Sequence, residues 1–251
     1  MRSGSRAWRA DVRRTVGLAR AFRHAQDDPD RFYSELAADA VAQVAVYADL
    51  GGALVADIGG GPGYYRTEFL ARGARYLVVD PDLRELSARG TVPPDVVIGD
   101  GMRLPVRSAS VDVAFSSNAL EHVPDPVRFA DEMVRVTRPG GLIFLSYTNW
   151  LSPNGGHETG PYHLVVGGRL AAERYARRNG HRPKNDLGRT LFRLSAAKML
   201  TWANTRECEG AVAVVDRRPR YHPQWARWVI NVPGVREVAT WNVLLVLRRP
   251  T

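Results

Sequence analysis

The stretch VADIGGGPGYY, residues 55–65, restricts the fold of this chain more than any other part of the sequence. A strand-like apolar run leads into an acid, Asp57, and residues 59–63 are then four glycines and one proline. Glycine has no Cβ atom, so such a turn can be tight and can bring the backbone close to a ligand. A helix is expected after Gly63. Strand, glycine-rich turn and helix together predict a site of the nucleotide-binding type.

Strand-like and helix-like segments alternate around this turn. The expected strands are residues 53–59, 75–80, 95–100, 110–117 and 140–147, and the expected helices between them include residues 81–90 and 126–137. Strands that alternate with helices at spacings of about 20–30 residues are typical of a parallel, doubly wound α/β sheet. The nearly continuous apolar strands indicate that helices cover both faces of the sheet.

The two ends of the chain depart from this alternation. Two helices, residues 6–23 and 30–49, are expected before the first strand. Residues 149–194 carry many Gly, Pro, His and Asn and little periodicity, and a helix over 195–204 and strands over 211–216 and 242–249 follow. A chain of 251 residues suits one α/β domain with insertions better than two full domains.

Composition excludes several classes of protein. The single cysteine, Cys208, rules out a disulfide framework and fits a reducing compartment. The N-terminus has no clean apolar leader, so we expect a cytoplasmic location. A net charge of +9 can attract anionic partners. However, the sequence holds no nucleic-acid-binding motif, and we expect no nucleic-acid partner. The oligomeric state stays open.

Five segments resemble, in order and spacing, the class I S-adenosylmethionine (SAM)-dependent methyltransferases. They are VADIGGGPGYY, YLVVDPD, VIGDGMRLPV, VDVAFSSNALEHVPDP and RVTRPGGLIFLSYT. Later segments such as SPNGGHETGPYH are similar to a largely uncharacterised actinobacterial methyltransferase group. The resemblance implies a Rossmann-like fold with a seven-stranded, mostly parallel sheet, an insertion after the fifth strand, and SAM as the cofactor. It divides a single domain, residues 1–251, into an N-terminal helical cap (1–49), a SAM-binding core (50–148) and acceptor-site lid segments (149–194 and 217–240).

The resemblance also assigns cofactor contacts by position. Asp57 leads the SAM loop, where an acid suits the ammonium group of the cofactor. Asp80 is expected to hold the ribose hydroxyls and Asp100 the adenine amino group, while Ser117 and Asn118 line the methionine end. The full set of expected cofactor-binding residues is Asp57, Gly59, Gly61, Gly63, Asp80, Asp100, Gly101, Met102, Ser117 and Asn118.

Histidines are the candidates for catalysis. Methyl transfer is an in-line displacement, so the enzyme mainly aligns the acceptor and excludes water. A hydroxyl acceptor must also lose a proton, and histidine is the natural base near neutral pH. His157 is the first candidate, followed by His122 and His163, with Tyr147 and Glu158 as alternatives. For His122, a structural hydrogen bond that fixes its loop is an equally good interpretation.

The expected function is therefore O-methylation of a small molecule, a sugar or a lipid-linked acceptor. C- or N-methylation, for example of a quinone-type acceptor, and a non-catalytic SAM-binding partner protein stay open as alternatives. An NAD-dependent oxidoreductase is disfavoured by Asp57, by Asp100 and by the SSNALEH segment. The HETGPYH stretch matches no zinc-binding spacing, so no metal ligand is assigned.

Two segments rich in arginine and tryptophan, residues 2–23 and 220–236, raise the question of a membrane. One interpretation is peripheral contact with a membrane surface, which would also involve Trp8. The other is a lid over the active site, with the arginines in water. The residues concerned in the later segment are Trp225, Trp228, Val229 and Val232, with Arg220, Arg227 and Arg236 around them.

Overall fold

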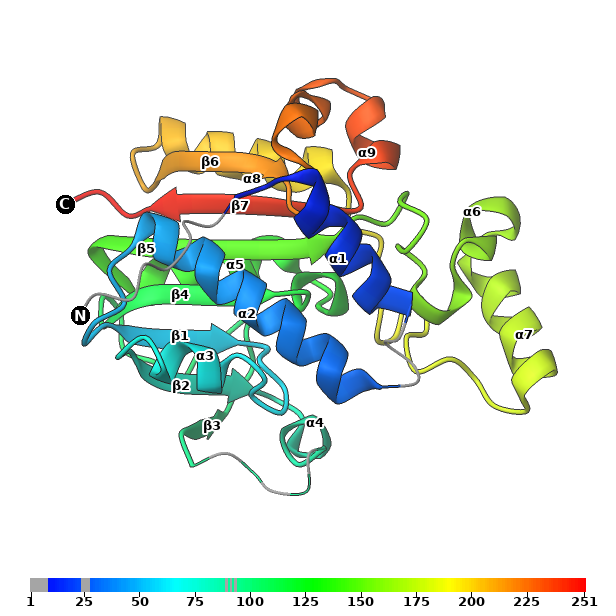
Figure 1. Ribbon diagram of the computed structural model, residues 1–251, viewed down its shortest axis with the longest axis horizontal. Coiled ribbons are helices and arrows are strands. Elements are labelled where there is room, and N and C mark those ends of the chain that lie inside the picture. Colours follow the sequence, from blue (N-terminus) through cyan, green and yellow to red (C-terminus); the bar gives the residue numbers. More distant parts are fainter. Residues whose placement is uncertain (1–8, 24–27, 89, 91, 93) are drawn as a thin grey trace.

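A seven-stranded sheet forms the centre of the protein (Figure 1). The computed structural model describes residues 9–23, 28–88, 90, 92 and 94–251. The strands are β1 (Leu54–Ile58), β2 (Arg75–Asp80), β3 (Val96–Ile98), β4 (Val111–Ser117), β5 (Thr137–Thr148), β6 (Ala213–Pro219) and β7 (Asn242–Arg248). Their order is β3-β2-β1-β4-β5-β7-β6. Strands β1 to β5 run parallel, and β7 is antiparallel to both β5 and β6. The predicted doubly wound, mostly parallel sheet is confirmed.

Helices cover both faces of this sheet. Helices α1 (Val12–Arg23), α2 (Pro29–Tyr47) and α3 (Arg66–Leu70) lie on one side, and α5 (Pro126–Val136) and α8 (Ala196–Cys208) on the other (Figure 1). The remaining helices are α4 (Leu83–Leu86), α6 (Tyr162–Val166), α7 (Gly168–Asn179) and α9 (Val235–Ala239), with short 3-10 helices η1 (Leu120–His122), η2 (His157–Thr159) and η3 (Gln224–Asn231).

Helix α5 illustrates how local sequence builds these elements. The carboxylate of Asp125 caps the helix by accepting a hydrogen bond from the backbone N–H of the first turn, and Pro126 occupies a position where its missing N–H costs nothing. Phe129, Met133 and Val136 then recur at helical spacing and are all buried against the sheet. The apolar stripe therefore decides which side of α5 faces the core.

The sheet separates two apolar cores, because successive side chains of a strand point to opposite faces. Ile58 of β1 packs with Phe129 on the α5 side, whereas Val55 packs with Phe69 and Phe115 on the α2 side. A truncation of a fully buried phenylalanine such as Phe115 to alanine typically costs about 3–5 kcal/mol of stability. These cores hold the strand ends, and with them the polar residues that follow each strand, in a defined arrangement.

Of the described α-helices, α6, α7 and α9 lie where the sequence analysis assigned none. Within residues 149–194, α6 and α7 project beyond the carboxyl ends of the parallel strands (Figure 1). In α7 the buried side is made of small residues, Ala171 and Ala172 with Gly168, so no stripe of large apolar residues marked it. The expected helix over 195–204 continues to Cys208, and the expected helix over 81–90 is shorter. Residues 1–8, including Trp8, and His24 lie outside the described residues.

Candidate functional site

The glycine-rich loop, residues 59–63, follows β1 directly. Gly59, Gly61 and Gly63 have φ values of 74°, 49° and 73°, in the left-handed region that favours glycine. A Cβ atom at Gly61 would meet no heavy atom within 4 Å, so the loop is open there. At Gly60, which the sequence analysis did not single out, a Cβ atom would lie 2.5 Å from Oδ2 of Asp57. The loop therefore approaches the carboxylate of Asp57 as closely as glycine allows.

Asp57 is buried near the end of β1, just before this loop, with 1% of its surface exposed. The hydroxyl of Tyr76 donates to its Oδ2, while its Oδ1 has no partner among the described residues. Burial raises the pKa of Asp57 to about 7, although the Tyr76 hydrogen bond acts in the opposite direction. A buried carboxylate oxygen without a partner is costly, so this atom is suited to a donor or a cation from a ligand.

Asp80, at the end of β2, ties the loop to the neighbouring strand. Its Oδ2 accepts the backbone N–H of Gly61 at 3.0 Å, and its Oδ1 accepts the backbone N–H of Asp82 at 2.9 Å. Burial raises the pKa of Asp80, and these two hydrogen bonds lower it. Each carboxylate oxygen keeps a second acceptor site, so Asp80 can still accept hydrogen bonds from ribose hydroxyls.

Residues 100–102 follow β3 at the same edge of the sheet. Asp100 is exposed, and its Oδ1 accepts the backbone N–H of Met102 at 2.8 Å. A Cβ atom at Gly101 would lie 2.3 Å from the ring of Phe129. The close packing of Gly101 against Phe129 of α5 therefore requires glycine at this position, with or without a ligand beside it.

Ser117, the last residue of β4, and Asn118, which follows it, belong to a polar network. Asn118 has φ of 58°, and its Oδ1 accepts a hydrogen bond of 2.7 Å from the side chain of Asn242 on β7. The Oγ atom of Ser117 lies 2.8 Å from the hydroxyl of Tyr65, which donates to it, and 2.8 Å from Nη1 of Arg220. The network therefore links the glycine-rich loop, the end of β4 and the chain that follows β6.

Arg220 is the centre of this network and is fully buried. Its guanidinium lies over the rings of Phe144 and Tyr221, with centroid distances of 5.5 and 5.2 Å. Its Nη1 also donates to Ser146 at 2.6 Å, but its Nε and Nη2 have no partner among the described residues, and no described carboxylate pairs with it. A buried charge without a counter-charge costs several kcal/mol. An anionic ligand group would remove that cost.

The expectation that Arg220 lies on a basic surface is wrong. Strand alternation explains its burial, because Asp216, Arg218 and Arg220 follow one another at every second residue and all three are buried. The backbone N–H of Arg220 donates to the carbonyl of Asn242 at 2.8 Å, which continues the pairing with β7 and directs the side chain inward. The sequence shows this alternation, but arginine is rarely fully buried unless it is paired, so the alternation alone did not predict that Arg220 is buried.

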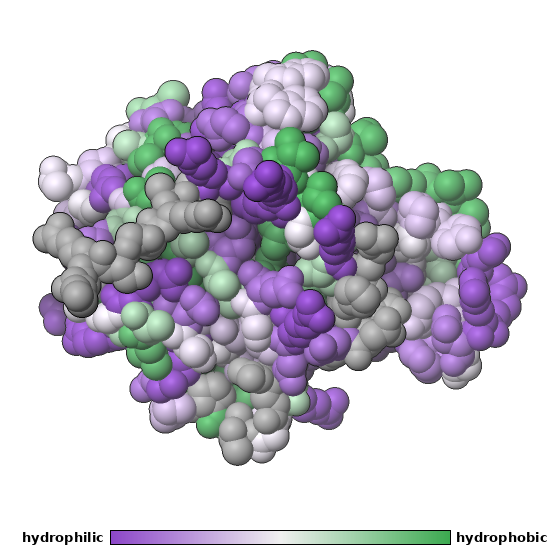
Figure 2. Space-filling view, in the orientation of Figure 1, coloured by the Kyte–Doolittle hydropathy of each residue, from purple (hydrophilic) through white to green (hydrophobic). Residues whose placement is uncertain are grey.

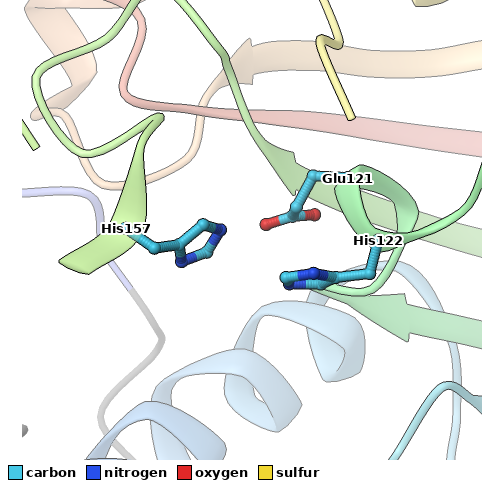
Figure 3. Close-up of side chains that lie close together, drawn as sticks. All are labelled: Glu121, His122 and His157. Atoms are coloured by element: carbon cyan, nitrogen blue, oxygen red, sulfur yellow. The ribbon is translucent and has the colours of Figure 1, made fainter. Parts of the chain in front are cut away.

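A second polar cluster lies past the ends of β4 and β5. Figure 3 shows Glu121 and His122 of η1 and His157 of η2 directed toward one another. One nitrogen or oxygen atom of each lies within 4.8 Å of the others, and the two imidazole rings have a centroid distance of 5.1 Å. Burial lowers the pKa of His157 to about 4, although Glu121 acts in the opposite direction. The sequence analysis did not single out Glu121. Its partner His157 belongs to a separate segment, so the two residues come together only in the folded chain.

The other candidates are engaged elsewhere. His163 is buried, with its Nε2 2.9 Å from the carbonyl oxygen of Trp150 and its ring edge-on to the indole. The hydroxyl of Tyr147 donates to a backbone carbonyl of the segment before α8. Glu158 accepts a hydrogen bond from the side chain of Asn185. Of the histidines singled out from the sequence, the structure therefore brings His122 and His157 together.

Comparisons with known proteins bear on the family of this chain. A family model described as a methyltransferase domain matches residues 56–145. A protein of Mycobacterium sp. (strain KMS), named as an uncharacterized methyltransferase, is 49% identical over 96% of this chain and 97% of its own length. The chain belongs to the methyltransferase family. A relative of the same name from Mycolicibacterium vanbaalenii is 48% identical to this methyltransferase over 96% of each chain.

Solved structures extend the likeness to the whole fold. The methyltransferase superimposes on an S-adenosylmethionine-dependent methyltransferase from Mesorhizobium loti with a TM-score of 0.55 and 20% identity, over 84% of this chain and 98% of that chain. This likeness shows the fold that the sequence analysis expected of a SAM-dependent methyltransferase. None of its described helices combines the length and the apolar character that crossing a membrane requires.

Proposed function

We propose that the methyltransferase transfers the methyl group of SAM to a hydroxyl oxygen of a small molecule, a sugar or a lipid-linked acceptor. The observation that carries this proposal is the cluster of Glu121, His122 and His157, in which Glu121 and His122 follow Asn118 closely in the chain. An amine attacks a methyl group without help once it is neutral, whereas a hydroxyl must give up its proton. The cluster offers the groups that can assist this loss.

The proposed cofactor site rests on unsatisfied charges. The methionine part of SAM is a zwitterion. Two of the buried groups with unpartnered atoms among the described residues have the complementary charges: Oδ1 of Asp57 suits the ammonium, and Nε and Nη2 of Arg220 suit the carboxylate. Tyr65 lies near both groups: burial raises the pKa of its hydroxyl, Arg220 lowers that pKa, and Asp57 raises it. Asp80 would then hold the ribose, and Asp100 the adenine amino group.

The bound cofactor would supply a methyl group made electrophilic by the sulfonium charge. The chain's own contribution is alignment of the acceptor oxygen and exclusion of water. We assign exclusion of water to the segments 149–194 and 217–240, together with the helices of residues 1–49. These segments lie outside the glycine-rich core and include α1, α6 and α7, which lie at the carboxyl end of the parallel strands (Figure 1).

Exposed apolar side chains support a lipid-linked acceptor and peripheral membrane contact. Trp225 is 70% exposed, Trp228 is 55% exposed and Val165 is 81% exposed. Figure 2 shows apolar surface over α6 and beside α9, at the upper right of the molecule. Val229 was expected on this surface but is buried. Tryptophan suits a membrane interface, because its ring is apolar and its N–H can donate a hydrogen bond.

A labelling experiment tests the proposed reaction. Purified methyltransferase is incubated with SAM carrying a labelled methyl group and with fractionated lipid and polar extracts of the source cells. We expect label in one product, and carbon-13 NMR of the methyl group should place it on oxygen. Label on carbon or nitrogen would establish the alternative methyltransferases. A protein that binds SAM but labels no fraction would favour the non-catalytic alternative.

A further inference from the structure

Glu121, His122 and His157 each present one atom that can bind a cation. The Nδ1 atom of His122 lies 2.7 Å from the carbonyl oxygen of Thr190, and a carbonyl only accepts, so Nδ1 is the donor and, in the neutral ring, Nε2 has the lone pair. Glu121 uses Oε1 to accept the backbone N–H of Thr148 at 3.1 Å. Its Oε2 is buried without a partner among the described residues, as is Nε2 of His157.

This pattern differs from an ordinary hydrogen-bonded cluster. Within the described part of the chain, Oε2 of Glu121 and Nε2 of His157 find no donor or acceptor although both are buried, and Glu121 is only 1% exposed. Buried polar atoms are nearly always satisfied, so such a pair of unpartnered atoms calls for a missing ligand. One atom from each of the three residues lies within 4.8 Å of the others, so a single ion could lie among them after a small contraction.

We propose that Glu121, His122 and His157 form a binding site for a divalent transition-metal ion. Two imidazoles and one carboxylate are donors that suit zinc, manganese, iron(II) or cobalt, whereas magnesium and calcium prefer oxygen ligands. Three protein ligands leave coordination positions open for water or substrate. The contact between His122 and the carbonyl of Thr190 is the outer hydrogen bond that commonly orients a metal-binding histidine.

Spacing along the chain could not reveal this site. Glu121 and His122 follow β4, and His157 follows β5, which is the hydrogen-bonded neighbour of β4 in the sheet. The carboxyl ends of parallel neighbours meet at one edge, so the three side chains converge only in the folded protein. The HETGPYH stretch contributes His157 to the cluster, while its second histidine, His163, is held by Trp150.

The role of the ion in catalysis rests on the proposed function, but its binding does not. An ion at this position would lower the pKa of an acceptor hydroxyl that binds beside it. The proton of that hydroxyl would pass to water, and the oxygen would form its bond to the methyl carbon as the sulfur–carbon bond breaks, leaving S-adenosylhomocysteine. The metal site would then favour acceptors with a hydroxyl that can reach one of the open positions.

Calorimetric titration of the metal alone tests the site without an acceptor. The protein is purified without a histidine tag, stripped with a chelator, dialysed, and titrated with Zn²⁺, Mn²⁺ and Co²⁺. We expect one ion per chain for at least one metal, and visible absorption from bound Co²⁺. Glu121→Gln preserves an acceptor for the N–H of Thr148, and His157→Asn suits the φ of 48° at that position. Each change should weaken binding at least tenfold.

The exposed His181 provides a matched control, because His181→Ala removes an imidazole outside the cluster. Melting temperature and SAM binding report whether each variant folds. Wild-type protein that binds SAM yet takes up no stoichiometric ion would overturn the proposal even if a variant failed to fold. Equal metal affinity in wild type, Glu121→Gln and His157→Asn would do the same. Neither result depends on whether the methylated atom is oxygen.

Discussion

The Nη1 atom of Arg220 lies 2.6 Å from Oγ of Ser146, so a fully buried positive charge bridges the ends of neighbouring strands. The same nitrogen reaches Ser117 on β4. A guanidinium in this position organises the site. Because two of its nitrogen atoms have no partner among the described residues, it also carries an electrostatic cost that a ligand carboxylate can relieve.

Arg220→Met should weaken SAM binding by roughly tenfold or more, because hydrogen bonds to a charged group contribute about 1.5–3 kcal/mol each. Binding of 5′-methylthioadenosine, which lacks the amino-acid part, should stay near normal. Isothermal titration calorimetry measures both affinities. Arg217→Met is the matched control, since Arg217 lies on β6, shortly before Arg220 in the chain, and is exposed. An equal loss for both ligands would show that Arg220 acts on the fold of the site and not on a carboxylate.

Gly61→Val should abolish detectable SAM binding. The position combines positive φ with open space beside the backbone, and a branched side chain would fill the space that the cofactor needs. Gly210→Val controls for backbone strain alone, because Gly210 also has positive φ and open space where a Cβ atom would lie, but follows α8. If both variants bound SAM as wild type does, the loop would not be the cofactor site.

SAM affinity should increase as pH rises toward 7. Burial raises the pKa of Asp57 to about 7, so the free protein holds this carboxyl largely protonated under acidic conditions. The cationic cofactor favours the ionised form, and binding below pH 7 should therefore release a proton. Calorimetry in two buffers with different ionisation enthalpies measures that release. Asp57→Asn should abolish it, and an unchanged proton count in this variant would exclude Asp57 as its source.

His157→Ala should lower turnover of the acceptor found by labelling by about a hundredfold or more, the usual scale for loss of assisted proton removal. SAM affinity should stay near normal, because His157 lies past β5 and not in the glycine-rich loop. Steady-state kinetics and calorimetry separate the two quantities. His181→Ala again serves as the control. Full activity of the His157 variant would mean that the acceptor needs no help in losing its proton.

The exposed tryptophans should mediate contact with anionic membranes. Co-sedimentation with anionic vesicles should be strong at low salt and weaker at physiological salt, since well-placed arginines contribute about 1 kcal/mol each. Trp225→Ala and Trp228→Ala should both reduce binding. Leu83→Ala removes an exposed apolar side chain of α4 and should have no effect. Absence of binding at low salt would leave a soluble acceptor as the better interpretation.

The sequence by itself determined the fold class and predicted one row of residues of the candidate site. Alternating strands and helices predicted the parallel sheet, and Asp57, Asp80 and Asp100 could be placed along one edge because each lies at or just past the end of a different strand. Parallel strands end on the same side, so this placement needed only the order of elements and not their packing. Helix α7 was not predicted from the sequence, because its buried face is made of small residues.

Only the tertiary structure decided which distant groups meet. His157 joins Glu121 and His122 because β5 pairs with β4, and Arg220 reaches Ser117 and Ser146 because β6 and β7 extend the sheet beyond β5. Periodicity reports which face of its own element a residue occupies, but not which other segment covers that face. The environment of a charged or titratable side chain depends on the segment that covers it. The burial of Arg220 and the convergence of Glu121, His122 and His157 are therefore properties of the fold.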